Sequence, residues 1–130
     1  MKRKWETPLA PRPSGRIAQV SIADELSLAY VSGLISQDKD GNILYGKTPA
    51  EQTEIILDNL KIIANELGLN MDHVIKTNIF LTDMNDFDEM NQVYSRYFSA
   101  DNPPARQCVQ SSVWGGLAVE ISAVLVLQKK

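Results

Sequence analysis

The sequence has few of the residues that build disulfides, metal centres and histidine-based active sites. Its 130 residues include one cysteine, Cys108, and one histidine, His73. One cysteine excludes an internal disulfide, and a lone histidine leaves no ligand cluster for zinc and no marked partner for a serine nucleophile. We therefore expect no metal site. We interpret Cys108 as a small buried apolar residue and His73 as a surface residue.

Long apolar runs and an excess of positive charge are absent as well. No stretch approaches the roughly 20 apolar residues of a membrane span. The basic start of the chain is followed by Glu6, Pro8 and Pro11, where a signal peptide needs an apolar region. Thirteen Lys and Arg against sixteen Asp and Glu give a net charge of −3, which provides no broad basic face for phosphate backbones. We expect a cytoplasmic protein that binds neither membranes nor nucleic acid.

The composition that remains is typical of one globular domain. Apolar residues make up 44% and charged residues 22% of a chain long enough to bury its own core. Residues 1–16 are basic and proline-rich and show neither helical nor strand periodicity. They are predicted to form an N-terminal arm, laid over the domain or loose. Residues 17–130 are predicted to form the single domain.

Hydrophobic periodicity predicts two helices among short strands. Thr48 and Glu51 flank a proline in a capping-box helix start, and Gly68 follows the last apolar residue of that helix. The second helix is predicted to begin at Asp86, with Glu89 completing a capping box, and to end before residue 101. Strands are predicted at 17–22, 28–32, 74–81, 106–113 and 119–127, with short extended pieces in 35–44.

This order, β-β-(β)-α-β-α-β-β, predicts an α+β fold in which two helices cover one face of a single mixed sheet. In the last strand, Val124 and Val126 make the second face apolar too, although no helix remains to cover it. We therefore expect another subunit on that face, and hence a homo-oligomer.

The last two strands are predicted to form a hairpin closed by residues 114–117. In that register Glu120 lies opposite Ser111, about 16 Å of strand away from Arg106. The two charged side chains then share no small pocket within one hairpin. They would act on one ligand only from two neighbouring subunits.

Arg106 and Glu120 are the candidates for chemistry. Arg106 follows Pro103 and Pro104, which provide a rigid extended mount, and its planar fork suits a carboxylate or phosphate. A solvated surface arginine is the alternative. Glu120 is a lone carboxylate between two apolar strand residues, so it either pairs with a cation or acts as an acid or base, unless it faces solvent at the strand end.

Two other features have ordinary structural explanations. Gly33 ends a strand, where a turn is a commoner reason for glycine than close approach to a ligand. The acidic residues between 83 and 89 are interpreted as a solvated helix start, because their spacing does not fit a calcium-binding loop.

The chain also contains eight short motifs in a particular order and spacing: Ser32-Gly33, the run from Gln52 to Lys61, Val74-Ile75-Lys76-Thr77, Asp83 to Phe87, Asn91-Gln92-Val93-Tyr94, Tyr97-Phe98, Pro104-Ala105-Arg106 and Val119-Glu120-Ile121. Together they resemble the Rid family of reactive intermediate deaminases, also called YjgF or L-PSP endoribonuclease-like proteins. The resemblance covers nearly the whole chain from about residue 15.

The resemblance implies a chorismate-mutase-like fold assembled as a homotrimer with three clefts between subunits. It also implies hydrolysis of enamines and imines such as 2-aminoacrylate to 2-keto acids and ammonia, without a cofactor. In the family's pattern Arg106 holds the substrate carboxylate and Glu120 positions or activates the attacking water. The other matching cleft positions are Ser32, Gly33, Asn91 and Cys108, and Ile17 occupies a further substrate-binding position of the cleft.

Some cleft positions depart from the family's pattern. Ile17 stands where a tyrosine is common, Leu34 where a glutamine is usual, and Arg16 where a proline is usual. These changes predict a more apolar cleft. An imine deaminase is the leading hypothesis, and a non-catalytic trimer that binds small carboxylates such as 2-keto acids is the alternative. Acidic charge and the lack of a histidine pair disfavour the third reading, an endoribonuclease or translation inhibitor.

Overall fold

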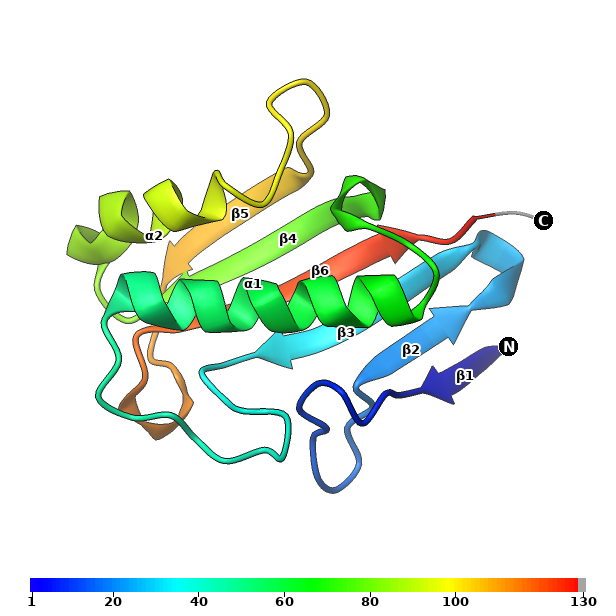
Figure 1. Cartoon of the computed structure of the whole chain (residues 1–130), viewed down its shortest axis with the longest axis horizontal. Coiled ribbons are helices and arrows are strands. Elements are labelled where there is room, and N and C mark those ends of the chain that lie inside the picture. Colours follow the sequence, from blue (N-terminus) through cyan, green and yellow to red (C-terminus); the bar gives the residue numbers. More distant parts are fainter. Residues whose placement is uncertain (129–130) are drawn as a thin grey trace.

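A computed structural model describes residues 1–128 as one six-stranded sheet with two helices on one side (Figure 1). The strands are β1 (Lys2–Trp5), β2 (Val20–Ala23), β3 (Leu28–Leu34), β4 (Val74–Leu81), β5 (Ala105–Gln110) and β6 (Val119–Val126), and the helices are α1 (Pro49–Glu66) and α2 (Phe87–Tyr94). The predicted α+β class is confirmed. Within residues 1–128, neither helix has the length and apolarity needed to cross a membrane.

The strands lie in the order β1-β2-β3-β6-β4-β5, and every neighbouring pair is antiparallel except β4 and β5. Parallel strands require a crossover, and α2 lies in the connection between β4 and β5. The core lies between the sheet and the helices. From α1 it includes the fully buried Ile56, Leu60 and Ile63, and from β6 the fully buried Leu125. The apolar face that hydrophobic periodicity predicts for α1 is therefore the face that is buried.

The hairpin predicted for the last two strands is wrong. β4 lies between β5 and β6, so Glu120 is opposite Phe80 of β4 and not opposite Ser111. Arg106 is level with Thr77 of β4. A strand that is apolar on both sides, such as β6, gains most burial in the middle of a sheet, and this outweighs the preference for pairing with its neighbour in sequence.

The N-terminal segment differs from the predicted arm because its first residues enter the sheet. β1 pairs with β2, which begins at Val20 rather than at Ile17. The third extended region at 35–44 contains no strand and makes one isolated bridge, between Gln37 and Ile43. The number of strands in the predicted order is therefore right, but the additional strand lies at the N-terminus.

The two helix starts behave differently. Thr48 and Glu51 form the predicted capping box of α1, and Gly68 beyond its end has a φ of +77°. The capping box predicted for α2 is wrong, because Asp86 makes no side-chain cap. The Glu89 carboxylate instead accepts a hydrogen bond of 2.8 Å from the backbone N–H of Ala50 in the first turn of α1. An unpaired N–H at a helix start is a strong site for a carboxylate, so Glu89 joins the two helices.

Gln19 fastens the N-terminal segment to the domain. Its side chain is 2% exposed; the amide oxygen accepts from the N–H of Thr7 at 2.8 Å, and the amide nitrogen donates to the carbonyls of Thr7, Ala10 and Pro11 at 3.1, 3.3 and 2.9 Å. These backbone N–H and carbonyl groups do not take part in strand pairing, so the buried Gln19 side chain provides their hydrogen bonds.

We expect Gln19→Leu, which keeps the volume of the side chain, to lower the free energy of unfolding by more than about 2 kcal/mol, because each buried backbone group left unpaired costs about 1–3 kcal/mol. Urea unfolding measures the difference, with the exposed Gln92→Leu on α2 as the matched control. Equal midpoints for the two variants would contradict this role of Gln19.

Candidate functional site

Arg106 lies on β5, at the edge of the sheet, and its side chain is on the side of the helices. It is level with Thr77, whose hydroxyl is 2.8 Å from the hydroxyl of Tyr94 on α2. Its Nη1 donates a hydrogen bond of 2.6 Å to the Asn91 side-chain oxygen. The guanidinium carbon also lies 4.9 Å from the ring centre of Tyr94 and 5.4 Å from that of Phe87. Neutral partners therefore hold this cation through a hydrogen bond and cation–π contacts.

The partners of Arg106 come from one face of α2. Phe87, Asn91 and Tyr94 are spaced by four and three residues, which places them on the same side of a helix. Asn91 is one of the cleft positions predicted from the sequence, and Tyr94 was named there only as part of a family motif. Sequence reasoning did not assign Phe87 to the site, although the same spacing identifies it. Within residues 1–128, no carboxylate forms an ion pair with Arg106, so its charge remains available to an anion.

Glu120 lies on the opposite face of the sheet. In β4, Thr77 is level with Arg106 and Phe80 is level with Glu120. Side chains alternate between the two faces along a strand, and Thr77 and Phe80 are an odd number of residues apart. Arg106 and Glu120 therefore point to opposite faces. In the described part of the chain the Glu120 carboxylate has no ion-pair partner, and partial burial raises its pKa above the ordinary value of glutamate.

Gly33 provides the space for the Glu120 side chain. It lies within β3, not in the predicted turn, and a Cβ atom at this position would be 2.6 Å from Oε2 of Glu120. The glycine therefore permits a close approach of backbone and carboxylate. The adjacent Ser32 hydroxyl donates to the carbonyl of Ala18 at 2.6 Å, which connects β3 to the segment before β2.

The candidate residues thus form two groups that one chain does not bring together. Arg106, Asn91 and Cys108 lie on the helix side, and Cys108 is partly buried, so that burial raises its pKa while Arg106 opposes the rise. Ser32, Gly33 and Glu120 belong to the strands β3 and β6. Arg106 and Glu120 are therefore separated as predicted, but the reason is that they lie on opposite faces of the sheet and not far apart along one hairpin.

Two of the positions that depart from the family's pattern have different environments. Ile17 is 56% exposed, in the segment before β2, so it is accessible to a ligand or a partner. Leu34 is 7% exposed and packs in the core. The apolar residue at position 34 is therefore explained by packing.

Gln52, which the sequence interpretation treated only as part of a motif, positions the start of β6. Its side chain is 5% exposed, and its oxygen accepts hydrogen bonds from the N–H groups of Ala118 and Val119 at 2.9 and 3.2 Å. These N–H groups directly precede Glu120. Nothing in its spacing marks Gln52 for this role, because its partners Ala118 and Val119 are 66 and 67 residues further along the chain.

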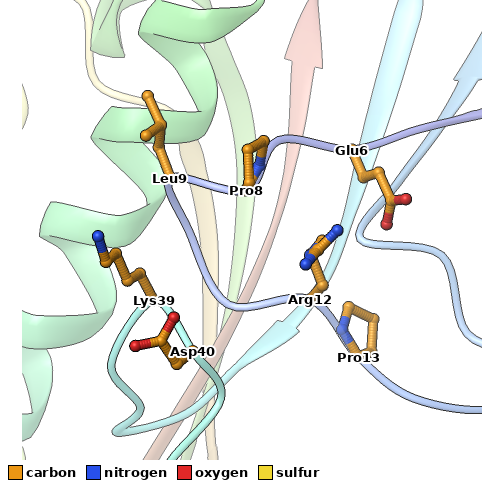
Figure 2. Close-up of a pocket in the computed structure, with 7 residues that line it drawn as sticks. All are labelled: Glu6, Pro8, Leu9, Arg12, Pro13, Lys39 and Asp40. Atoms are coloured by element: carbon orange, nitrogen blue, oxygen red, sulfur yellow. The ribbon is translucent and has the colours of Figure 1, made fainter.

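Two of the pockets in the structure bear on where a ligand could bind. A pocket of about 270 Å³ lies beside Arg106 and is lined by the end of α2 and by Pro103 and Pro104. A larger hollow of about 630 Å³ lies under the N-terminal segment (Figure 2) and is lined by Glu6, Pro8, Leu9, Arg12, Pro13, Lys39 and Asp40. It includes no residue of the candidate site, and its two cations and two carboxylates favour no sign of ligand charge.

Comparison with known proteins identifies the class that this fold and site represent. The family model described as Endoribonuclease L-PSP matches residues 7–127. A RutC family protein of Saccharolobus solfataricus is 40% identical over 113 residues, which cover 86% of each chain. The RutC family protein UK114 of Drosophila melanogaster is 39% identical over 110 residues, which cover 85% of this chain and 78% of that protein.

Solved structures agree with this assignment. The structure of E. coli TdcF with bound serine has a TM-score of 0.83 at 31% identity and covers 97% of this chain and 99% of that one. RidA from an Antarctic Psychrobacter has a TM-score of 0.85 at 29% identity, covering 96% and 99%. The chain belongs to the L-PSP family, which includes the Rid and YjgF proteins. The resemblance read from the motifs is confirmed.

We expect Glu120→Gln to change the pH dependence of stability. Because the folded pKa of Glu120 is raised, the folded protein binds more protons than the unfolded chain between the ordinary and the raised pKa. The free energy of unfolding of the protein therefore falls as pH increases through this window. Glu120→Gln should remove the contribution of the Glu120 carboxyl to this fall. Urea unfolding at several pH values measures it, with the exposed Glu6→Gln as control. Identical pH profiles for Glu120→Gln and wild type would contradict the raised pKa.

Proposed function

We propose that the protein is an imine and enamine deaminase, which hydrolyses intermediates such as 2-aminoacrylate to 2-keto acids and ammonia. The observation that carries the proposal is the Arg106 guanidinium, which Asn91 and two aromatic rings orient and which has no carboxylate partner within residues 1–128. A cation that is held in place but not neutralised suits a substrate carboxylate, which it can bind through two hydrogen bonds. Membership of the L-PSP family supports the proposal.

The reaction makes few demands on the protein. The carbon of a protonated C=N bond is already electrophilic, so the site needs to anchor the acid group and orient one water molecule. In the proposed mechanism the water oxygen adds to this carbon while Glu120 accepts a water proton. Glu120 then returns this proton to the nitrogen. As the C–N bond breaks and ammonia leaves, Glu120 accepts the proton of the new hydroxyl group, the C=O bond forms, and the proton passes to solvent. The raised pKa of Glu120 brings it closer to neutral pH, which favours this exchange of one proton.

The opposite orientation of the two charged residues leads us to propose a site shared between subunits. Glu120 of one copy would complete the site of Arg106 in the next, in a homotrimer with clefts between subunits. The sheet face without helices supports an interface there, because it exposes apolar side chains, among them Tyr30 at 50%, Val109 at 39% and Val126 at 36%. Patches of this kind mark interaction surfaces.

A non-catalytic trimer that binds 2-keto acids through Arg106 is the second candidate. The observation that favours it is Ile17, which is exposed and offers no polar group to a substrate. Calorimetry with a 2-keto acid beside a turnover assay separates binding from catalysis. The ribonuclease reading of the family's description has little support from a chain with net charge −3 and one histidine. RNA cleavage by nuclease-free, metal-free protein would restore it.

We expect wild-type protein to accelerate ammonia release from 2-aminoacrylate, generated in place from serine by a dehydratase. Arg106→Ala should reduce kcat/KM at least about 100-fold, because it removes two charge-assisted hydrogen bonds to the substrate. Arg96→Ala, an exposed arginine that follows α2, is the matched control and should keep wild-type activity. Full activity of a folded Arg106→Ala protein would refute the anchoring role.

We expect two inactive variants to complement each other. When Arg106→Ala and Glu120→Gln subunits are mixed in equal amounts and refolded together, about one quarter of the shared sites combine an intact Arg106 with an intact Glu120. Ammonia release should therefore recover to about a quarter of the wild-type rate, whereas each variant refolded alone stays inactive. No recovery in mixed oligomers confirmed by mass spectrometry would contradict a site shared between subunits.

A further inference from the structure

The pocket beside Arg106 has a polar end and an apolar wall. At the polar end, the side-chain oxygen of Asn91 accepts from Arg106, which leaves the amide N–H groups of Asn91 and the other N–H groups of the guanidinium as donors. Both residues line the pocket, whose volume is about 270 Å³. This end therefore provides donors only, as a carboxylate requires.

The serines of the pocket add little further polarity. The hydroxyl of Ser95 donates to the backbone carbonyl of Asn91 at 2.8 Å, and the hydroxyl of Ser99 accepts from the N–H of Asp101 at 3.2 Å. Both hydroxyls are thus engaged with nearby backbone groups, in bonds typical of a helix end and a tight turn. Away from Arg106 and Asn91, the side-chain donor left to a ligand is the O–H of Ser99, because this hydroxyl only accepts in its backbone bond.

The rest of the lining is apolar and held in place. Phe98 packs against Tyr94 with ring centres 4.6 Å apart, and Pro103 and Pro104 form another part of the lining. Proline rings have few conformations, so this wall changes little when a ligand binds. Ligand pockets begin at about 300 Å³, which makes this one suited to a molecule of amino-acid size. A methyl or methylene group would leave most of it empty.

We propose that this pocket selects 2-imino acids with a branched or aromatic apolar side chain over 2-aminoacrylate and other small ones. The carboxylate binds Arg106 and Asn91, and the side chain lies against Phe98 and Pro104. The inference rests on the proposed function for its reaction, but the preference of the pocket is a property of binding and is measured without turnover.

Calorimetry with two 2-keto acids tests the preference. Pyruvate and 4-methyl-2-oxopentanoate share the acid group and differ by three apolar carbons, and each buried methylene strengthens binding about fourfold. With part of that area buried, the larger acid should bind wild-type protein about tenfold more tightly. Ala100→Trp, an exposed position in the pocket lining, should bring the ratio of the two dissociation constants close to one.

Gln92→Trp is the matched control, because it introduces the same indole side chain at an exposed position of α2 outside the lining, and it should keep the wild-type ratio. Equal affinities in wild type, no binding of either acid, or an unchanged ratio in Ala100→Trp would each overturn the inference. Thermal unfolding of both variants shows that they are folded.

A parallel turnover assay reports on the proposed function separately. D-amino-acid oxidase with catalase generates the imines of alanine and leucine, and semicarbazide traps whatever imine is not hydrolysed. If the protein speeds the loss of imine but binds the two keto acids equally tightly, the deaminase function is supported and the selectivity of the pocket is refuted. If the larger acid binds tenfold more tightly but no imine is hydrolysed, the selectivity of the pocket is supported and the deaminase function is refuted.

Discussion

The antiparallel pairing of β6 with both β3 and β4 is the constraint on which the candidate site depends. It places Glu120 beside Gly33 on one side and level with Phe80 on the other. It also moves β5 to the edge of the sheet, where Arg106 is accessible. The Gln52 side chain reinforces this arrangement, because it satisfies the two N–H groups at the start of β6. A central strand whose start is held in this way is a rigid support for the Glu120 carboxylate.

The electrostatics of the two faces are complementary. On the helix side a guanidinium is held by a neutral amide and aromatic rings, so its charge is retained for a ligand. On the other face a carboxylate is partly buried, residues 1–128 provide no cation for it, and its pKa is raised. Neither charged group has an ion-pair partner within these residues, and perturbed charged groups of this kind cluster at functional sites. The proposed site between copies would bring the two groups together.

In the proposed function, the pocket beside Arg106 would select among imine substrates. Hydrolysis of an imine depends on groups near the C=N bond, whereas discrimination between imines depends on what surrounds the side chain. The connection between α2 and β5 provides those surroundings, and its two prolines also place Arg106 at the start of the strand. In the proposed function, this short segment would serve both the carboxylate anchor and the selection of the side chain, so that substitutions there would affect binding and substrate range together.

Local patterns in the sequence were sufficient for much of this structure. The capping box at Thr48, the bounds of β4, the two-helix arrangement and the choice of Arg106 and Glu120 all follow from residues close together in the chain. The family resemblance also follows from short motifs.

Tertiary structure alone decided which strands are neighbours. The position of β4 between β5 and β6, the use of Glu89 to cap the other helix, and the close approach of Gly33 to Glu120 join residues that are far apart in sequence. Alternation along a strand shows which residues share a face, but the pairing of strands depends on the total area buried by the whole sheet. That total is a property of the assembled core, and no single stretch of sequence contains it.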